Sequence, residues 1–273
     1  MKTRMTIPLI LPEAACPHRC VFCNQHTITG KHKGPSQQEI EETIGQYLST
    51  KRASVTHVEV GCFGGSFTGL PEEEMLGVLR AIRPWITSGE VHGIRISTRP
   101  DYITPQKLAL LKEMHVTTVE LGVQSHRDRV LLASGRGHTA AHTEKASAMI
   151  LEGGFRLGHQ LMIGLPGEEE GDEVYNAETS IRQQAADIRI YPVLVLKGTE
   201  LATRYLQGTY QPLTLEVALI KAKRMVERFD QAGCNTIKVG LHPSESFSRG
   251  ELMAGPWHPN FRQKMWRCGD VGR

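Results

Sequence analysis

The 273-residue chain has no long hydrophobic run, no low-complexity stretch and no internal repeat. Because about twenty consecutive apolar residues are needed to cross a bilayer, nothing in the sequence predicts a membrane-spanning helix. The first residues are basic, but the apolar stretch after them is too short and too interrupted by proline for a secretory signal peptide. We therefore expect a cytoplasmic protein that has no membrane partner.

A large excess of one charge is also missing. The formal net charge is +3, with 22% charged and 40% hydrophobic residues, which is ordinary for a globular protein. This charge neither requires nor excludes a nucleic-acid partner. The length fits one large domain, or one domain with a small appendage.

Cysteine is limited to six residues, and no second closely spaced group accompanies the N-terminal set Cys16, Cys20 and Cys23. A disulfide framework is not expected, because the chain is large enough to bury a core and shows no secretory signal. The other cysteines are isolated, and the sequence assigns them no role: Cys62, Cys234 and Cys268.

Three thiolates within eight residues indicate a 4Fe-4S cluster, which usually has four thiolate ligands. With no fourth cysteine nearby, one iron would stay open for a substrate or cofactor, so the spacing favours catalysis over electron storage. The alternative is a tetrahedral zinc site whose fourth ligand is His18 or His26. Zinc ribbons usually have two separated cysteine pairs. A zinc-stabilised binding module without turnover remains the alternative hypothesis.

Phe22 directly precedes the third cysteine, and Cys-x3-Cys-x2-Cys with an aromatic residue there resembles the signature of the radical S-adenosylmethionine (SAM) superfamily. In that superfamily the open iron binds the amino and carboxylate groups of SAM. One-electron reduction then cleaves SAM to a 5'-deoxyadenosyl radical, which abstracts hydrogen from a substrate. The resemblance implies a 4Fe-4S cluster on Cys16, Cys20 and Cys23, SAM as a second cofactor, and a reductant such as flavodoxin or ferredoxin.

Short apolar runs alternate with longer amphipathic stretches, which predicts β-α units around a parallel sheet. The expected strands span seven runs: 5–11, 57–63, 92–97, 117–123, 156–164, 187–194 and 235–241. A capping box at Ser36 and Glu39 and the pair Thr104-Pro105 predict helix starts. Periodicity alone leaves a doubly wound sheet open, whereas the resemblance implies an α/β fold that is a partial (β/α)6 TIM-like barrel.

Glycines and polar residues follow the expected strands at their carboxyl ends, where ligands bind in parallel β-α architectures. Gly64-Gly65-Ser66 comes after the second strand, and glycines let the backbone approach a ligand closely. A tight turn is the alternative interpretation. Arg136 stands just before a helix, where a guanidinium suits a carboxylate.

Further polar residues lie within or after the middle strands. Glu120 and Gln124 have the same parity in the fourth strand and so share a face. Polar groups inside a barrel are costly without partners, so they indicate a lined cavity, with a core Glu–Arg pair as the alternative for Glu120. Gln160 is polar in a strand that is otherwise largely apolar, and Arg99 and Asp101 either pair or serve the site.

As a set, Gly-Gly-Ser, Gly-Val-Gln-Ser, Arg-Gly-His-Thr and Ile-Gly-Leu-Pro-Gly-Glu resemble one branch of the superfamily across residues 5–200. That branch holds the oxygen-independent coproporphyrinogen III oxidases and the radical SAM domain of the elongator catalytic subunit. The resemblance implies that these residues contact SAM: Phe22, Gly64, Gly65, Ser66, Gln124, Arg136 and Gln160. Ile10 stands where the oxidases carry a tyrosine, which argues against a porphyrinogen substrate.

We expect residues 1–240 to form the core barrel, with the cluster loop at 12–30, and residues 241–273 to form a C-terminal loop extension. Relative to stand-alone members of the elongator-like group, this extension is expected to be truncated. Its candidate substrate-site residues are His242, Trp257 and His258, with loop packing as the alternative. The sequence does not specify the substrate, and a tRNA base is a hypothesis from fold-level analogy.

Overall fold

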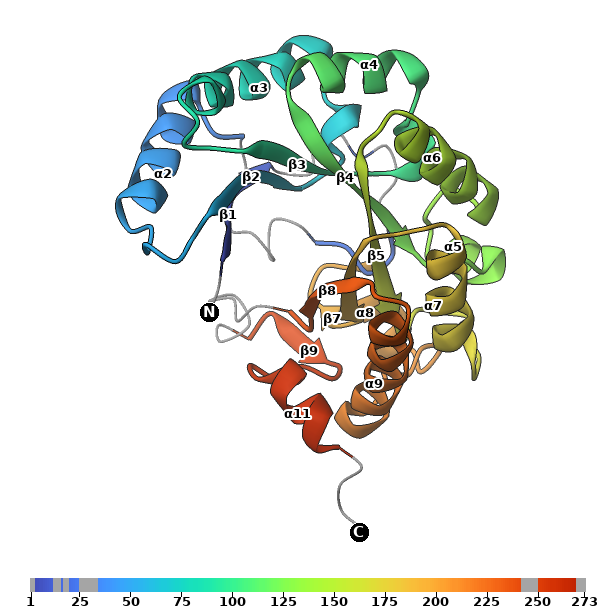
Figure 1. Cartoon of the computed structure of the whole chain (residues 1–273). Coiled ribbons are helices and arrows are strands. Elements are labelled where there is room, and N and C mark those ends of the chain that lie inside the picture. Colours follow the sequence, from blue (N-terminus) through green and yellow to red (C-terminus); the bar gives the residue numbers. More distant parts are fainter. Residues whose placement is uncertain (1–2, 12–15, 17–19, 25–33, 242–249, 269–273) are drawn as a thin grey trace.

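The computed structural model describes residues 3–11, 16, 20–24, 34–241 and 250–268. Its main feature is a curved sheet of seven strands, all parallel, in the order β1-β2-β3-β4-β5-β6-β8. Figure 1 shows the helices arranged around the outside of this curve. Among the described residues, no helix is both long and apolar enough to cross a membrane.

The strands of the main sheet are β1 (Arg4–Leu11), β2 (His57–Gly64), β3 (Gly93–Thr98), β4 (Val116–Gln124), β5 (Arg156–Ile163), β6 (Asp187–Pro192) and β8 (Asn235–Val239). They follow one another across the sheet in chain order, without the reversal that defines a doubly wound sheet. The expected partial barrel is therefore confirmed. A separate antiparallel pair joins β7 (Val195–Leu196) to β9 (Leu252–Ala254).

The helices are α2 (Gln37–Ser49), α3 (Glu72–Thr87), α4 (Pro105–Glu113), α5 (Asp128–Ala133), α6 (Ala140–Glu152), α7 (Asp172–Arg182), α8 (Glu200–Leu206), α9 (Leu215–Gln231) and α11 (Phe261–Arg267). The predicted capping box is confirmed, since Ser36 and Glu39 bond to each other's backbone N–H. The predicted cap at Thr104 is confirmed as well, because its hydroxyl accepts from the backbone N–H of Lys107 at 3.3 Å.

The two faces of the sheet differ in burial, as the first strand shows. Ile7, Leu9 and Leu11 of β1 are buried in the core between sheet and helices, where Ile40 and Ile44 of α2 also lie. The intervening residues 6, 8 and 10 point the other way and stay partly or fully exposed. The apolar core thus lies between the sheet and its helices, and the inner face of β1 is partly exposed.

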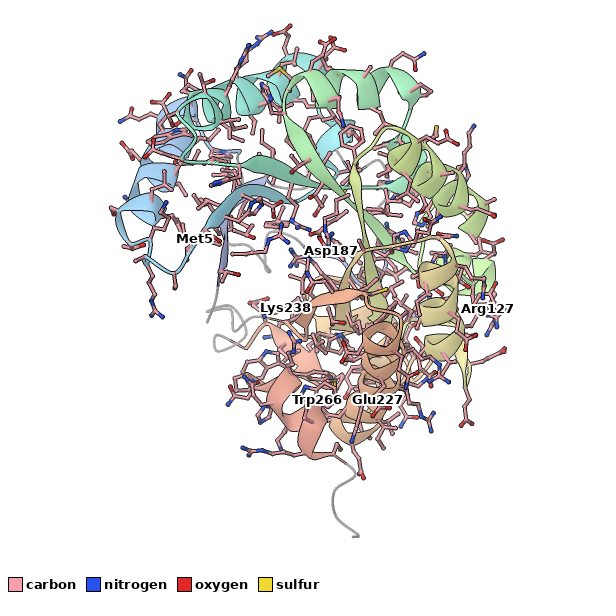
Figure 2. All side chains as sticks on the ribbon, in the orientation of Figure 1. Met5, Arg127, Asp187, Glu227, Lys238 and Trp266 are labelled. Atoms are coloured by element: carbon pink, nitrogen blue, oxygen red, sulfur yellow. The ribbon has the colours of Figure 1, made fainter. Side chains whose placement is uncertain are left out.

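The inner face carries charge in its deeper part. Arg95 of β3 donates to three buried carboxylates: Glu120 at 2.7 Å, Asp187 at 2.9 Å and Glu59 at 3.1 Å. Figure 2 shows Asp187 on the concave side of the sheet. Burial raises the pKa of Asp187, but bonds from Arg156 and the attraction of Arg95 outweigh it and hold that pKa at about 2. Asp187 is therefore ionised and paired at neutral pH.

The structure corrects the sequence reasoning in the C-terminal third. The expected sixth strand, 187–194, ends at Pro192, and α8 was not predicted. Residues 241–273 were expected to form a loop extension, but they contain β9 and α11. Burial of Phe261 and Met265, four residues apart on one face, explains this short helix.

Candidate functional site

The cysteine loop begins at the carboxyl end of β1 and is held against segments far away in sequence. The backbone N–H of Val21 donates to Ser134 at 3.1 Å, and the Val21 carbonyl accepts from Leu201 at 2.8 Å. The N–H of Cys23 donates to the carbonyl of Cys20 at 2.9 Å, so the last two cysteines lie in one tight turn. Cys16 is exposed, Cys20 buried and Cys23 half-buried.

Phe22 anchors the same turn from its apolar side. It is half-buried and packs against a cluster that includes Val130, Leu165 and Val193, from α5 and from the ends of β5 and β6. Asn24 adds a polar tie, because its side-chain amide donates to the carbonyl of Lys197 at 3.1 Å. The aromatic residue of the motif therefore positions the loop across the strand ends.

Arg136 reaches the cysteine loop from the segment between α5 and α6. Its Nη1 donates to Cys20 Sγ at 3.1 Å, and its Nη2 donates to the carbonyl of Gly122 at 2.6 Å. Its own carbonyl accepts from Arg99 Nη2 at 2.6 Å. The Arg136 side chain is buried, and its Nε finds no hydrogen-bond partner among the described residues. A guanidinium next to a cysteine sulfur stabilises the thiolate, which is the form that binds metal.

Cys16 lies in the same charged surroundings. Although the residue is exposed, neighbouring atoms desolvate its thiol and raise the pKa, and Cys20 raises it further. A hydrogen bond from the Ser66 backbone and the cations Arg99 and Arg136 act in the opposite direction. The structure thus brings Cys16 near Cys20 and near the loop after β2.

In the part of the chain that the structure describes, no three His, Cys, Asp or Glu side chains converge closely enough to hold a metal ion. The assignment of Cys16, Cys20 and Cys23 as iron ligands therefore stays a prediction. Much of the predicted loop 12–30 lies outside the described residues.

Gly64, the last residue of β2, must be glycine because of its contact with β1. Gly64 has φ +119°, and a Cβ there would overlap the carbonyl oxygen of Leu11. The same carbonyl accepts from the N–H of Gly65 at 2.9 Å. Ser66 is buried, with its hydroxyl 2.9 Å from that of Thr98 and accepting from the Arg99 N–H at 3.1 Å. This loop locks the end of β1, where the cysteine loop begins, to the ends of β2 and β3.

Gln124 ends β4 in a strained conformation. Its φ is +65°, in the left-handed region, and the pairing of β4 with β5 shifts between Leu121 and Gln124. Such strain in a non-glycine residue is concentrated at functional sites. A Cβ on Gly122 would stand 3.1 Å from Gln124 Nε2 and 3.4 Å from Arg136 Nη2. Gly122 therefore leaves room for two of the predicted site residues to meet.

Gln160 is committed to the inner-face network. Its side-chain amide donates to Ser97 at 2.9 Å and to Glu120 at 2.8 Å. Both amide N–H groups are therefore engaged, and the side-chain carbonyl oxygen is the atom that can accept a hydrogen bond from a ligand. Glu120 also accepts from Arg189 at 2.7 Å, and the core-pair interpretation of Glu120 is the correct one. Gln160 lies in the middle of β5 and is not gathered with the strand-end residues.

Charge and burial determine the state of two further residues, Arg99 after β3 and His138 between α5 and α6. Arg99 pairs with Asp101 through two bonds of 2.9 Å each, as one sequence interpretation expected. His138 is buried, and this burial, together with Arg136 and Arg99, lowers its pKa to about 3. The imidazole is therefore neutral near the cysteine loop at physiological pH. His138 belongs to the Arg-Gly-His-Thr motif, but no role for it was predicted, because the burial of a loop histidine depends on distant packing.

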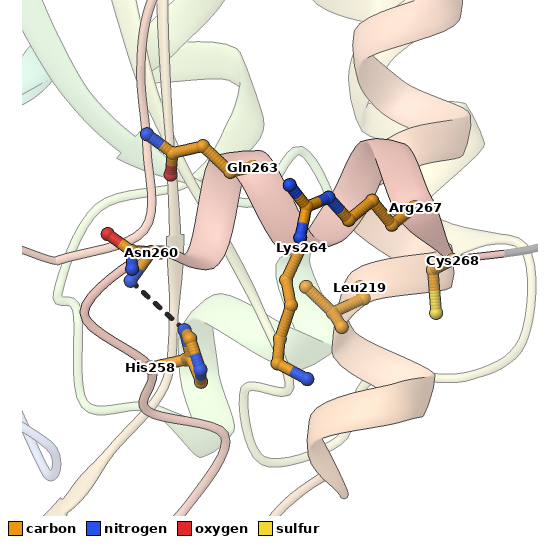
Figure 3. Close-up of a pocket in the computed structure, with 7 residues that line it drawn as sticks. All are labelled: Leu219, His258, Asn260, Gln263, Lys264, Arg267 and Cys268. Carbon is orange, nitrogen blue, oxygen red and sulfur yellow. Dashed lines mark hydrogen bonds between the residues drawn. The ribbon is translucent and has the colours of Figure 1, made fainter.

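The C-terminal candidates separate in the structure. His242 lies outside the described residues. Trp257 packs on the small cluster of Leu194 and Leu196, with Leu241 beside it, in agreement with the packing alternative. His258 lines a surface cavity near α11 (Figure 3) and is not gathered with the residues around Cys20.

Comparison with known proteins matches most of the chain to two family models. Residues 11–177 match the Radical SAM superfamily, and residues 186–266 match the Radical_SAM C-terminal domain. An uncharacterised protein of Methanocaldococcus jannaschii is 28% identical over 214 residues, which cover 72% of this chain and 64% of that protein. The tRNA uridine(34) acetyltransferase of Methanocaldococcus infernus is 35% identical over 127 residues, 45% of this chain and 24% of the relative. This chain thus spans less than two thirds of either relative.

Solved structures share the fold at low sequence identity. The archaeal Elp3 of Methanocaldococcus infernus superposes with a TM-score of 0.74 at 19% identity, covering 98% of this chain and 62% of that one. The Escherichia coli coproporphyrinogen III oxidase gives a TM-score of 0.58 at 16% identity, covering 85% and 54%. The branch that the sequence motifs resemble is confirmed by these relatives. Because the first family model covers more than half of the residues, the chain belongs to the radical SAM superfamily, a superfamily of enzymes.

Proposed function

We propose that this protein holds a 4Fe-4S cluster on Cys16, Cys20 and Cys23 and cleaves SAM reductively. The observation that carries the proposal is the contact between Arg136 and Cys20 Sγ at 3.1 Å, which joins two family motifs 116 residues apart in sequence. When bound, the cluster and SAM together supply a 5'-deoxyadenosyl radical that abstracts hydrogen from a substrate. The chain's own residues bind, orient and shield these groups.

The surroundings of the cysteines fit a cluster of thiolate ligands. Arg136 donates to Cys20, and Arg136 and Arg99 partly offset the desolvation that raises the pKa of Cys16. Thiolates rather than thiols bind iron, so two neighbouring guanidinium groups lower the cost of gathering negative sulfur atoms. Zinc would use the same thiolates, which makes metal content the first discriminating property.

The residues that would hold SAM line the strand ends around this loop. We assign the role to six of the predicted residues: Phe22, Gly64, Gly65, Ser66, Gln124 and Arg136. Support comes from the buried Arg136 Nε, which has no partner among the described residues, and from the strained φ of Gln124. Gln160 offers its carbonyl oxygen from deeper in the barrel, where Ser97 and Glu120 fix its orientation.

The substrate we propose is a base in RNA, with a reductant such as flavodoxin or ferredoxin supplying the electron in the cytoplasm. A relative with 35% identity over 127 residues is named as a tRNA uridine(34) acetyltransferase, which supports an RNA substrate. Addition of tRNA should then raise the rate of 5'-deoxyadenosine formation. An unchanged rate over a range of tRNA preparations would argue against RNA as the substrate.

Cluster loading tests the metal assignment directly. Anaerobic reconstitution with iron and sulfide should give a brown protein with about four irons per chain, whereas Cys20→Ala should lose the colour. Cys234→Ala is the matched control, since Cys234 is half-buried and far from the loop in sequence. One zinc per chain in colourless wild-type protein would contradict the proposal and favour a zinc module.

A further inference from the structure

The surface cavity that His258 lines is between α9 and α11. Its volume is about 460 Å³. It is lined by Leu219 of α9 and by residues of the C-terminal segment: His258, Asn260, Gln263, Lys264, Arg267 and Cys268. Figure 3 shows Lys264 extending from α11 past Leu219, with His258 on one side and Cys268 on the other. None of the proposed cluster or SAM residues lines this cavity.

The described lining residues present hydrogen-bond donors and no carboxylate. Lys264 and Arg267 bring two positive charges, and Asn260 and Gln263 bring side-chain amides. His258 accepts the backbone N–H of Asn260 on Nδ1 at 3.0 Å, so a neutral ring carries its proton on Nε2 and donates there. A cavity with this lining is chemically complementary to an oxyanion.

Packing of α11 holds the two cations on one side of the helix. Lys264 and Arg267 are three residues apart and so lie on neighbouring turns of one face. Phe261 and Met265, on the other face, are buried in the main core together with residues of α9. The carbonyl of Cys268 accepts from Lys223 Nζ of α9 at 3.0 Å, which fixes the end of α11. The backbone of α11 is thereby anchored, and its exposed cations Lys264 and Arg267 lie beside the cavity.

The cavity also lies at the end of the barrel where the cysteine loop is found. Gly240 directly follows β8, and a Cβ on it would stand 2.7 Å from the Cβ of Phe261, so α11 begins at the carboxyl end of the sheet. Leu219 belongs to the second turn of α9, and helices of β-α barrels start at that same end. The cavity is therefore on the same side of the molecule as the carboxyl ends of the strands.

We propose that the cavity lined by Lys264 and Arg267 is a phosphate-binding subsite that anchors a phosphorylated substrate outside the barrel mouth. Arg and Lys side chains together with amide donors match the oxygens of a phosphate group. Its volume lies within the range of about 300–1,000 Å³ that is typical of ligand pockets. The role as substrate anchor rests on the proposed function, but binding of the anion does not.

Isothermal titration with inorganic phosphate at low ionic strength tests the subsite on the full reconstituted chain. Lys264→Gln combined with Arg267→Gln should weaken phosphate binding at least tenfold. Arg262→Gln is the matched control, since Arg262 is an exposed cation of α11 that does not line the cavity, and its affinity should stay within twofold of wild type. Melting temperatures close to wild type would show that all variants fold.

The source of the phosphate is distinguished by two further probes. Uridine 5'-monophosphate binding as tightly as a 5'-phosphorylated oligoribonucleotide indicates a small substrate, and tighter binding of the oligonucleotide indicates RNA. Loss of both in the double variant supports the subsite. Equal phosphate affinity in wild type and double variant, or no binding to wild type, overturns it. The proposed function fails separately, by absence of SAM cleavage in wild-type protein.

Discussion

An Arg95→Met substitution would remove the cation at the centre of the inner-face network. Arg95 Nη1 lies 2.7 Å from Glu120 and 2.9 Å from Asp187, and Nη2 lies 3.1 Å from Glu59. These four side chains are 7% exposed or less, so water cannot replace the lost guanidinium. Breaking a buried ion pair on one side costs about 3–5 kcal/mol of unfolding free energy, and we expect this range.

Loss of the Arg95 guanidinium would destabilise the three carboxylates to different degrees. Glu120 keeps Arg189 at 2.7 Å, and Asp187 keeps Arg156 at 2.6 Å. Among the described residues, the partner that Glu59 keeps is His57, whose Nε2 is 3.5 Å from the carboxylate. Most of the penalty should therefore reside in the uncompensated charge of Glu59.

This reasoning predicts a rescue. Glu59→Gln in the Arg95→Met background should recover about 1–3 kcal/mol, because it removes a buried charge that has lost its partner. Urea unfolding at pH 7, followed by circular dichroism, measures each value. Arg80→Met is the control, since Arg80 is 59% exposed and 3.5 Å from an exposed Glu73, and it should cost less than about 1 kcal/mol. A loss for Arg95→Met as small as the control, or no recovery with Glu59→Gln, would refute the account.

Two other substitutions and their controls follow from the structure. Gly64→Ala should destabilise the protein by about 1–3 kcal/mol and lower cluster loading, because φ is +119° and the new Cβ overlaps Leu11. Gly77→Ala in α3 has open space and should stabilise it by about 0.5–1 kcal/mol; equal melting temperatures for the two variants would contradict this. Burial, with a contribution from Arg182, lowers the pKa of His126 to about 3. Between about pH 6.5 and 3 the imidazole is therefore protonated in the unfolded chain but neutral in the folded chain. Stability should consequently fall as the pH is lowered, by about 2 kcal/mol from this residue between pH 7 and 5. His126→Gln should reduce that pH-dependent loss in urea titrations, and an unchanged slope would count against it.

Local patterns in the sequence were sufficient to predict most of the fold. Each strand of the main sheet was expected within a few residues, because each coincides with a short apolar run in the sequence. The caps at Ser36 and Thr104 depend on side chains three residues from their partners. Information of this range is contained in a short window of sequence.

Contacts between distant segments could not be predicted in the same way. The motifs indicated that Arg136 serves the site, but not that it bonds to Cys20, since this contact depends on how α5 packs over the loop. Gln160 was expected beside the strand-end residues, but its amide bonds to Ser97 and Glu120 inside the barrel. Helix α11 begins after Asn260, whose side chain makes no cap bond, so its formation depends on burial of Phe261 and Met265 against distant segments.

Quantification of 5'-deoxyadenosine tests the central claim most directly. Wild-type protein, reconstituted anaerobically with iron and sulfide, reduced with dithionite and given SAM, should form 5'-deoxyadenosine above a no-protein control. Cys20→Ala should form none, and Cys234→Ala should match wild type. Cleavage of SAM by Cys20→Ala at the wild-type rate, or no cleavage by wild-type protein with a full cluster, would contradict the account.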